Sequence, residues 1–144
     1  MWRNEHLKIM ELKVESKIGR LRTDDGRIYG FLSNCNNFQQ FTAHDKVKNW
    51  FSDSDSCSFT IDGAGDVVFR IVERRPNELV KFSIENAQAE NIFLWVQLKT
   101  ANPGDTRVKL TAKLEVNPMV RMFISKPLQQ GLDRIVETLE NFCS

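Results

Sequence analysis

Cysteine and histidine, the residues that form disulfides and bind metals, are scarce in this 144-residue sequence. Its three cysteines, Cys35, Cys57 and Cys143, are odd in number and lack CxxC-type spacing, which argues against a disulfide framework and against a thiolate zinc site. His6 and His44 are the only histidines, and neither has a second ligand at metal-like spacing. We therefore expect reduced cysteines, no metal site and no cofactor.

Long apolar runs and a strong excess of one charge are missing too. The longest apolar run, residues 92–96, is far too short to span a membrane, and residues 1–13 lack an apolar core of signal-peptide length. The 20 basic and 19 acidic residues leave a formal net charge of +1, whereas nucleic-acid binders carry a clustered basic footprint. We therefore expect a soluble, cytoplasmic protein with one domain over residues 1–144, no membrane span and no nucleic-acid partner.

Catalytic sequence motifs are also lacking. The GAG at residues 63–65 begins a GxG, but Val68 stands where the third glycine would be, so a hairpin turn is the better interpretation than a phosphate loop. There is no GxSxG, HExxH, P-loop or supported Cys–His motif. Some polar residues are candidates for acid–base chemistry only by their position, and ordinary surface roles are favoured for them. An enzyme is therefore the less favoured interpretation. These candidates are Tyr29, His44, Arg70, Glu73 and Gln97.

What the sequence does contain is one long amphipathic segment at its C-terminal end. Residues 117–142 predict a helix, because Asn117 can cap the first turn and Pro118 loses only a donor that has no partner there. Pro127 lies inside the segment, where a proline costs ~3 kcal/mol in a straight helix, so we expect a kink or short break at residues 123–126. The predicted apolar stripe consists of Val120, Ile124, Leu128, Leu132, Ile135, Leu139 and Phe142.

Two features of this helix invite a functional interpretation. Gly131 interrupts the apolar stripe at a cost of ~1 kcal/mol relative to alanine, and it either leaves space for a ligand or permits a close approach of helix and sheet. Met119, Met122 and Phe123 point away from the stripe in the first turns. These three residues either form an adaptable lid, since methionine repacks easily, or fill the core.

Upstream of the helix, alternation of apolar and polar residues predicts seven strands. The first spans residues 8–20, and Thr23 then offers an N-cap for a short helix carrying residues 28–32. A second short helical segment is expected at residues 36–41. Short turns between the remaining strands favour an antiparallel meander. These strands are residues 47–52, 56–62, 66–74, 78–85, 91–100 and 105–116.

The strand at residues 91–100 is apolar on both faces. We place its aliphatic set inward, which leaves Phe93 and Trp95 on the outer face. Such a pair is either a homodimer contact or local cross-strand packing. Local packing is the better interpretation, because isolated exposed apolar residues need no special explanation. The sequence is therefore compatible with a monomer or a homodimer.

Seven segments of the chain resemble the SRPBCC, or START-like, superfamily, which includes the polyketide cyclases. The segments are residues 16–19 (SKIG), 28–33 (IYGFLS), 71–74 (IVER), 93–98 (FLWVQL), 106–110 (TRVKL), 117–119 (NPM) and 125–132 (SKPLQQGL). The resemblance spans nearly the whole chain and is to the small single-domain branch. It implies an α+β helix-grip fold, in which a seven-stranded curved antiparallel sheet wraps around the long C-terminal helix. Two short helices follow the first strand, and a ligand cavity lies between sheet and helix.

The resemblance implies no single reaction, since the superfamily includes lipid carriers, cyclases, hydroxylase subunits and chaperone activators. The side chains expected inside are mostly aliphatic and aromatic, which suits an apolar molecule but offers little for proton transfer. We therefore expect binding of a small hydrophobic or amphipathic ligand (lipid, isoprenoid or polyketide-like). The alternatives are a cyclase/aromatase-like enzyme and a protein-interaction module that uses the outer sheet face. The predicted ligand-binding residues are Val14, Phe31, Phe59, Phe69, Phe82, Leu94, Leu110, Met119, Phe123, Leu128 and Gly131.

Overall fold

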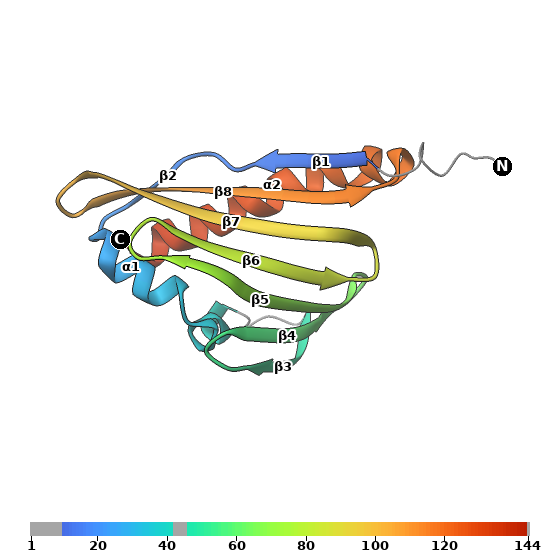
Figure 1. The fold of residues 1–144 in the computed structure, drawn as a ribbon, viewed down its shortest axis with the longest axis horizontal. Coiled ribbons are helices and arrows are strands. Elements are labelled where there is room, and N and C mark those ends of the chain that lie inside the picture. The colour runs from blue at the N-terminus through green and yellow to red at the C-terminus, as the bar shows by residue number, and fades with distance from the viewer. Residues whose placement is uncertain (1–9, 42–45, 144) are drawn as a thin grey trace.

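A curved antiparallel sheet crossed by one long helix makes up most of the computed structural model, which describes residues 10–41 and 46–143 (Figure 1). The strands are β1 (Met10–Glu15), β2 (Gly19–Leu21), β3 (Val47–Ser52), β4 (Ser56–Ile61), β5 (Gly65–Arg75), β6 (Leu79–Asn86), β7 (Ala89–Asn102) and β8 (Asp105–Val116). The helical elements are α1 (Asp25–Leu32), the 3-10 helix η2 (Cys35–Phe41) and α2 (Pro118–Phe142).

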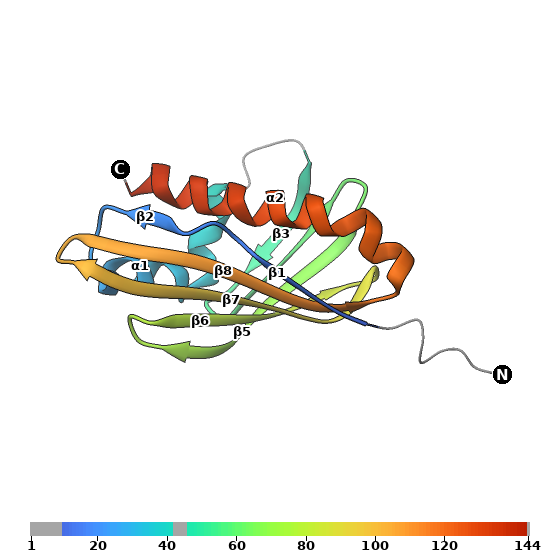
Figure 2. The same cartoon turned by 90° about the horizontal axis from the view of Figure 1, so that it is seen from above.

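The predicted meander is confirmed. Strands β3 to β7 each pair antiparallel with the next strand in the chain. Both β1 and β2 pair with β8, so the order is β1-β8-β7-β6-β5-β4-β3. The first and last strands of the sequence therefore lie side by side. The helix α2 runs along one face of this sheet (Figure 2).

The first predicted strand, residues 8–20, is divided into two strands within the described part of the chain, which gives the sheet eight strands instead of seven. Ser16 donates its N–H to the carbonyl of Leu110 (2.8 Å), and its Oγ accepts the N–H of Leu110 (2.9 Å). Asp133 of α2 accepts the N–H of Lys17 (2.7 Å). These hydrogen bonds replace the regular strand pairing with β8, so the strand is interrupted at residues 16–18. The pairing with β8 resumes in β2. Residues 8 and 9 lie outside the described residues.

The cap of α1 is Asp24 and not the predicted Thr23. Asp24 has the extended backbone of an N-cap, but its side chain makes no capping bond, because its Oδ1 accepts the N–H of Gly104 (2.9 Å). The carbonyl of Thr23 accepts a hydrogen bond from Thr106 Oγ1 (2.8 Å). Both bonds fasten α1 to the β7–β8 hairpin, so tertiary contacts set the start of this short helix. The second predicted helical segment is η2.

The start of α2 is as predicted, since Asn117 caps it by accepting the N–H of Val120 (2.8 Å) and Pro118 is its first residue. Of the predicted kink or short break at residues 123–126, the break is absent, because the helix is continuous over Pro127. Figure 2 shows a bend, since the first turns leave the line of the remaining helix. In the described part of the chain, no helix combines the length and the hydropathy of a membrane span.

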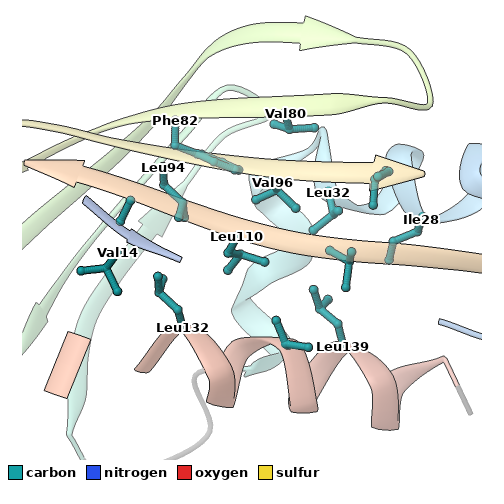
Figure 3. Close-up of a cluster of buried hydrophobic side chains, with 14 of the residues drawn as sticks. Val14, Ile28, Leu32, Val80, Phe82, Leu94, Val96, Leu110, Leu132 and Leu139 are labelled. Carbon is teal, nitrogen blue, oxygen red and sulfur yellow. The ribbon is translucent and has the colours of Figure 1, made fainter. Parts of the chain in front are cut away.

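The face of α2 that meets the sheet differs slightly from the predicted stripe. Leu132, Val136 and Leu139 are buried, and Leu132 and Leu139 lie opposite Leu110 of the sheet (Figure 3). Val136, which the predicted stripe omits, is 0% exposed, whereas Ile135 is 43% exposed. The helix is therefore rotated so that Val136 faces the packed part of the interface. Its main packing partners are β1, β2 and β8.

The outer sheet face carries Phe93 and Trp95, as predicted. Their ring centroids are 6.1 Å apart. Lys81 Nζ lies 4.7 Å from the centroid of Phe93 and 4.9 Å from that of Trp95, and Lys113 Nζ lies 5.7 Å from that of Trp95. The neighbouring strands thus cover this aromatic pair with cations, which is local cross-strand packing.

Candidate ligand cavity

A cavity of about 350 Å³ lies between α2 and the inner face of the sheet. Strands β3 to β8 each contribute at least one side chain to it, and α1 and η2 contribute Phe31 and Phe38. Ligand pockets in proteins span roughly 300–1,000 Å³ and are lined mainly by apolar and aromatic side chains. The cavity therefore has the size of a site for one small molecule.

Aromatic side chains form one continuous wall of this cavity. Successive ring centroids are 5.5 Å apart for Trp50–Phe59, 5.8 Å for Phe59–Phe69, 5.9 Å for Phe69–Phe82, 5.9 Å for Phe82–Phe38 and 6.1 Å for Phe38–Phe31. The wall exists because Phe59, Phe69 and Phe82 occupy diagonal positions on β4, β5 and β6. Rings at these separations pack in tilted or offset pairs and hold each other in place. The wall thus offers a fixed set of ring faces and edges.

The opposite wall is α2, where Gly131 faces the cavity. A Cβ placed on Gly131 would have no atom within 4 Å, so this glycine does not serve a close approach of helix and sheet. That role belongs to Gly19, where an added Cβ would clash with Cγ1 of Val136 and lie 3.0 Å from Cγ1 of Val108. Of the two interpretations open from the sequence, the geometry favours the one in which Gly131 leaves space.

The structure brings seven of the predicted site residues together around the cavity: Phe31, Phe59, Phe69, Phe82, Leu94, Leu110 and Gly131. Four others lie elsewhere. Val14 is buried beside Ala112 in the packed part of the interface, and Leu128 is a half-buried residue at the core margin. Met119 and Phe123 are 70% and 72% exposed, and they lie on the first turns of α2, which bend away from the line of the remaining helix (Figure 2). They neither fill the core nor reach the cavity.

Sequence reasoning missed Trp50, which lines the cavity from β3. The pairing of β3 with β4 shifts between Lys48 and Phe51, and Asn49 has a positive φ of 58°. This bulge turns Trp50 inward and leaves Phe51 67% exposed. The available signal was Asn49, because asparagine tolerates the left-handed region and this one directly precedes the aromatic pair Trp50-Phe51.

Only a few polar groups reach the cavity. Among the described lining residues, the polar side chains are Arg134 and Thr138 on α2, the thiol of Cys57 and the indole N–H of Trp50. The indole donates to Ser52 Oγ (3.3 Å), and Thr138 Oγ1 donates to the carbonyl of Arg134 (2.9 Å). The interior is therefore apolar, and its charged rim lies on α2.

Cys57, which lines the cavity from β4, is hydrogen-bonded to Cys35 of η2. Both are buried and unbridged. A hydrogen bond to Cys57 and burial raise the pKa of the Cys35 thiol, so this thiol stays protonated at neutral pH. A protonated, buried thiol is a poor nucleophile, so Cys35 belongs to the packing of η2 against β4. The same hydrogen bond lowers the pKa of the Cys57 thiol, which lines the cavity.

The polar candidates for acid–base chemistry do not converge on the cavity. Arg70 pairs with Glu85 (3.5 Å) and Glu73 with Arg75 (2.7 Å), while Gln97 accepts a hydrogen bond from Thr111 Oγ1 (3.1 Å). None of these, nor Tyr29, is among its described lining residues. His44 and His6 lie outside the described residues, and no cluster of three metal-ligating side chains occurs within those that are described. The arrangement suits binding better than proton transfer.

Comparison with known proteins identifies the architecture. No protein-family model matches the sequence, and no curated protein matches it. Among solved structures, norcoclaurine synthase from Thalictrum flavum has 10% identity and a TM-score of 0.73 over 94% of this chain and 95% of that one. The Mll3558 protein from Rhizobium loti has 13% identity and a TM-score of 0.71 over 92% and 97%. The chain has a START/SRPBCC-like helix-grip fold.

The solved structures that match this chain belong to different proteins. One norcoclaurine synthase structure contains dopamine and hydroxybenzaldehyde. The Aha1 dimer from Colwellia psychrerythraea matches at 18% identity and a TM-score of 0.51 over 69% of this chain and 74% of that one. At these identities the likeness concerns the fold, since one fold hosts many functions.

Proposed function

We propose that this protein binds one small hydrophobic or amphipathic molecule, of lipid, isoprenoid or polyketide-like character, in the cavity between α2 and the sheet. The observation that carries the proposal is the empty space at Gly131 opposite a continuous aromatic wall. Apolar cavities of this kind exclude water and accept apolar molecules. A ligand there would restore the dispersion contacts that the lining side chains lack.

The fold comparison supports this proposal by analogy. Norcoclaurine synthase, which has the same architecture, was solved in complex with two small aromatic molecules. The cavity described above has the size of a small-molecule site and is lined by aromatic rings, but its polar groups are few and do not converge. Binding without a chemical step is therefore preferred over a cyclase-like activity.

The proposal is tested with N-phenylnaphthylamine, a neutral apolar fluorescent probe. We expect the wild type to bind it with enhanced probe fluorescence and quenching of Trp50, and a Trp50→Phe variant to lose the quenching. Gly131→Leu should weaken binding at least about tenfold, because the new side chain occupies the space that the glycine leaves. Native mass spectrometry of the purified protein adds an independent readout of a co-purifying molecule.

The matched control is Gln130→Leu, which adds the same side chain at the adjacent exposed position of α2. It should bind the probe like the wild type. Equal affinities for Gly131→Leu and wild type, or no probe binding by wild type together with a ligand-free mass, would refute the proposal.

A further inference from the structure

The cavity has one charged group on its rim. Arg134 is the charged side chain among the described lining residues, and it lies on α2 one turn from Gly131 and beside Thr138. Its side chain is exposed, as is a large part of the neighbouring Ile135. The open side of the cavity along α2 therefore combines an apolar interior with a cation in water.

The carboxylates of α2 point to another part of the molecule. Asp133 accepts the N–H of Lys17 (2.7 Å), Glu137 pairs with Lys17 Nζ (2.6 Å), and Glu140 accepts the N–H of Arg20 (2.9 Å). Asp133 and Glu137 fasten α2 to the β1–β2 connection, and Glu140 fastens it to β2. The helix thus turns its negative charge to the packed edge of the sheet and a positive charge to the cavity.

The guanidinium of Arg134 is available for a ligand. Within the described part of the chain, it forms no hydrogen bond or ion pair with a carboxylate or a carbonyl, and the main-chain carbonyl of Arg134 accepts a hydrogen bond from Thr138 Oγ1. Arg74 shows the contrast, because it donates to the carbonyls of Ser33 and Ser54 and to Asp55. A guanidinium presents a planar fork of donors that matches a carboxylate or a phosphate.

We infer that the ligand is amphipathic and carries an anionic oxygen head group, a carboxylate or a phosphate, which Arg134 binds at the rim while the apolar body fills the cavity. This inference rests on the proposed function. The volume of about 350 Å³ is near the lower end of the roughly 300–1,000 Å³ of ligand pockets, which favours one acyl chain or a small ring system over a two-chain lipid.

The test compares three ligands that share one apolar chain: decanoate, decyl phosphate and decanol. Each displaces N-phenylnaphthylamine from the wild type at low ionic strength and pH 7.4. We expect both anions, or one of them, to bind about tenfold more tightly than decanol, the size of effect of one charge-assisted hydrogen-bonded pair at a partly wet site. A preference for decanoate identifies a carboxylate ligand, and a preference for decyl phosphate identifies a phosphate.

The variants Arg134→Gln and Arg134→Lys separate head-group binding from packing. Arg134→Gln should abolish the preference for anions and leave decanol affinity unchanged, whereas Arg134→Lys should retain part of it. Arg121→Gln is the matched control, since Arg121 is an exposed arginine on the same helix and outside the cavity lining. Added salt should weaken the anions and spare decanol.

Two results would overturn the inference, and they are distinguishable. Equal affinity of wild type for decanol and both anions, with no effect of Arg134→Gln, refutes the head-group role and leaves apolar binding intact. Failure of all three ligands and of the neutral probe to bind refutes the proposed function as well.

Discussion

On one side of α2, Val136 packs against Gly19 and Val108 so closely that a single added carbon would clash; on the other, Gly131 faces a cavity where an added carbon would meet nothing. The same helix, over about one and a half turns, therefore forms both a packed and an open interface with one sheet. The packed side is fastened by β1, β2 and β8. The open side faces the aromatic wall of β3 to β6.

This difference shows how a small protein keeps an empty interior without losing its fold. Close packing and the polar bonds of Asp133 and Glu140 hold the helix on one side, so the other side does not need to collapse. An interior void costs stability in proportion to the contacts that its walls lack. In this protein that cost is confined to the side of α2 where a ligand could offset it.

The largest effect is expected where the packed side is disturbed. Gly19→Ala should lower the free energy of unfolding by about 1–3 kcal/mol, because its Cβ would overlap Val136 and crowd Val108. Urea denaturation measures this change. In the double variant with Val136→Ala, the loss should be smaller than the sum of the single losses, since the overlapping Cγ1 is removed. Additive losses would contradict the steric explanation.

The architecture was largely predictable because it depends on local signals. Apolar and polar residues alternate in β8 from Val108 to Val116, and Asn117-Pro118 marks the start of α2. Periodicity could not decide the rotation of α2, because Ile135 and Val136 are adjacent and both apolar. The division of the first strand could not be predicted from local sequence either, since it depends on a hydrogen bond between Ser16 and Leu110, which is 94 residues away in the chain.

The candidate site was predictable in part for the same reason. Phe59, Phe69 and Phe82 lie on regular strands, so alternation alone placed them inward. Trp50 was not predicted, because a bulge in β3 reverses which side chains point inward after Lys48. Met119 and Phe123 are apolar and so are predicted to line the cavity, yet apolar character alone does not say which turns of a helix are covered, and both are exposed.

A smaller effect, of opposite sign, is expected on the open side. Gly131→Ala should raise the free energy of unfolding by up to about 1 kcal/mol, because alanine favours the helix and its Cβ meets no atom. Gly30→Ala on α1 is the matched control, since a Cβ there also meets nothing and Gly30 does not line the cavity. Both variants should be stabilised in urea denaturation. Destabilisation by Gly131→Ala alone would show that α2 approaches the sheet more closely than described.

The smallest effect concerns the charges that fasten β2 on the packed side. Arg20 and Arg107 lie directly opposite each other on β2 and β8, and Asp105 contacts both, with Oδ1 3.2 Å from Arg107 Nε and Oδ2 3.4 Å from Arg20 Nη2. The hydrogen bond from Arg107, with the positive charge of both arginines, lowers the pKa of Asp105 below its ordinary value of 3.8. Without this carboxylate the two cations would repel each other across the strands.

The sign of the pH dependence follows from that lowered pKa. A carboxyl group with a lower pKa in the folded state contributes stability above its unfolded pKa, and the contribution is lost as the pH falls through the folded pKa. Urea midpoints at pH 5, 4 and 3 should therefore fall more for wild type than for Asp105→Asn, which lacks the titrating group. Glu78→Gln, a charge-matched change at the exposed β5–β6 turn, should retain the wild-type slope. Parallel profiles for wild type and Asp105→Asn would mean that packing around Gly19, and not this ion cluster, holds β2 in place.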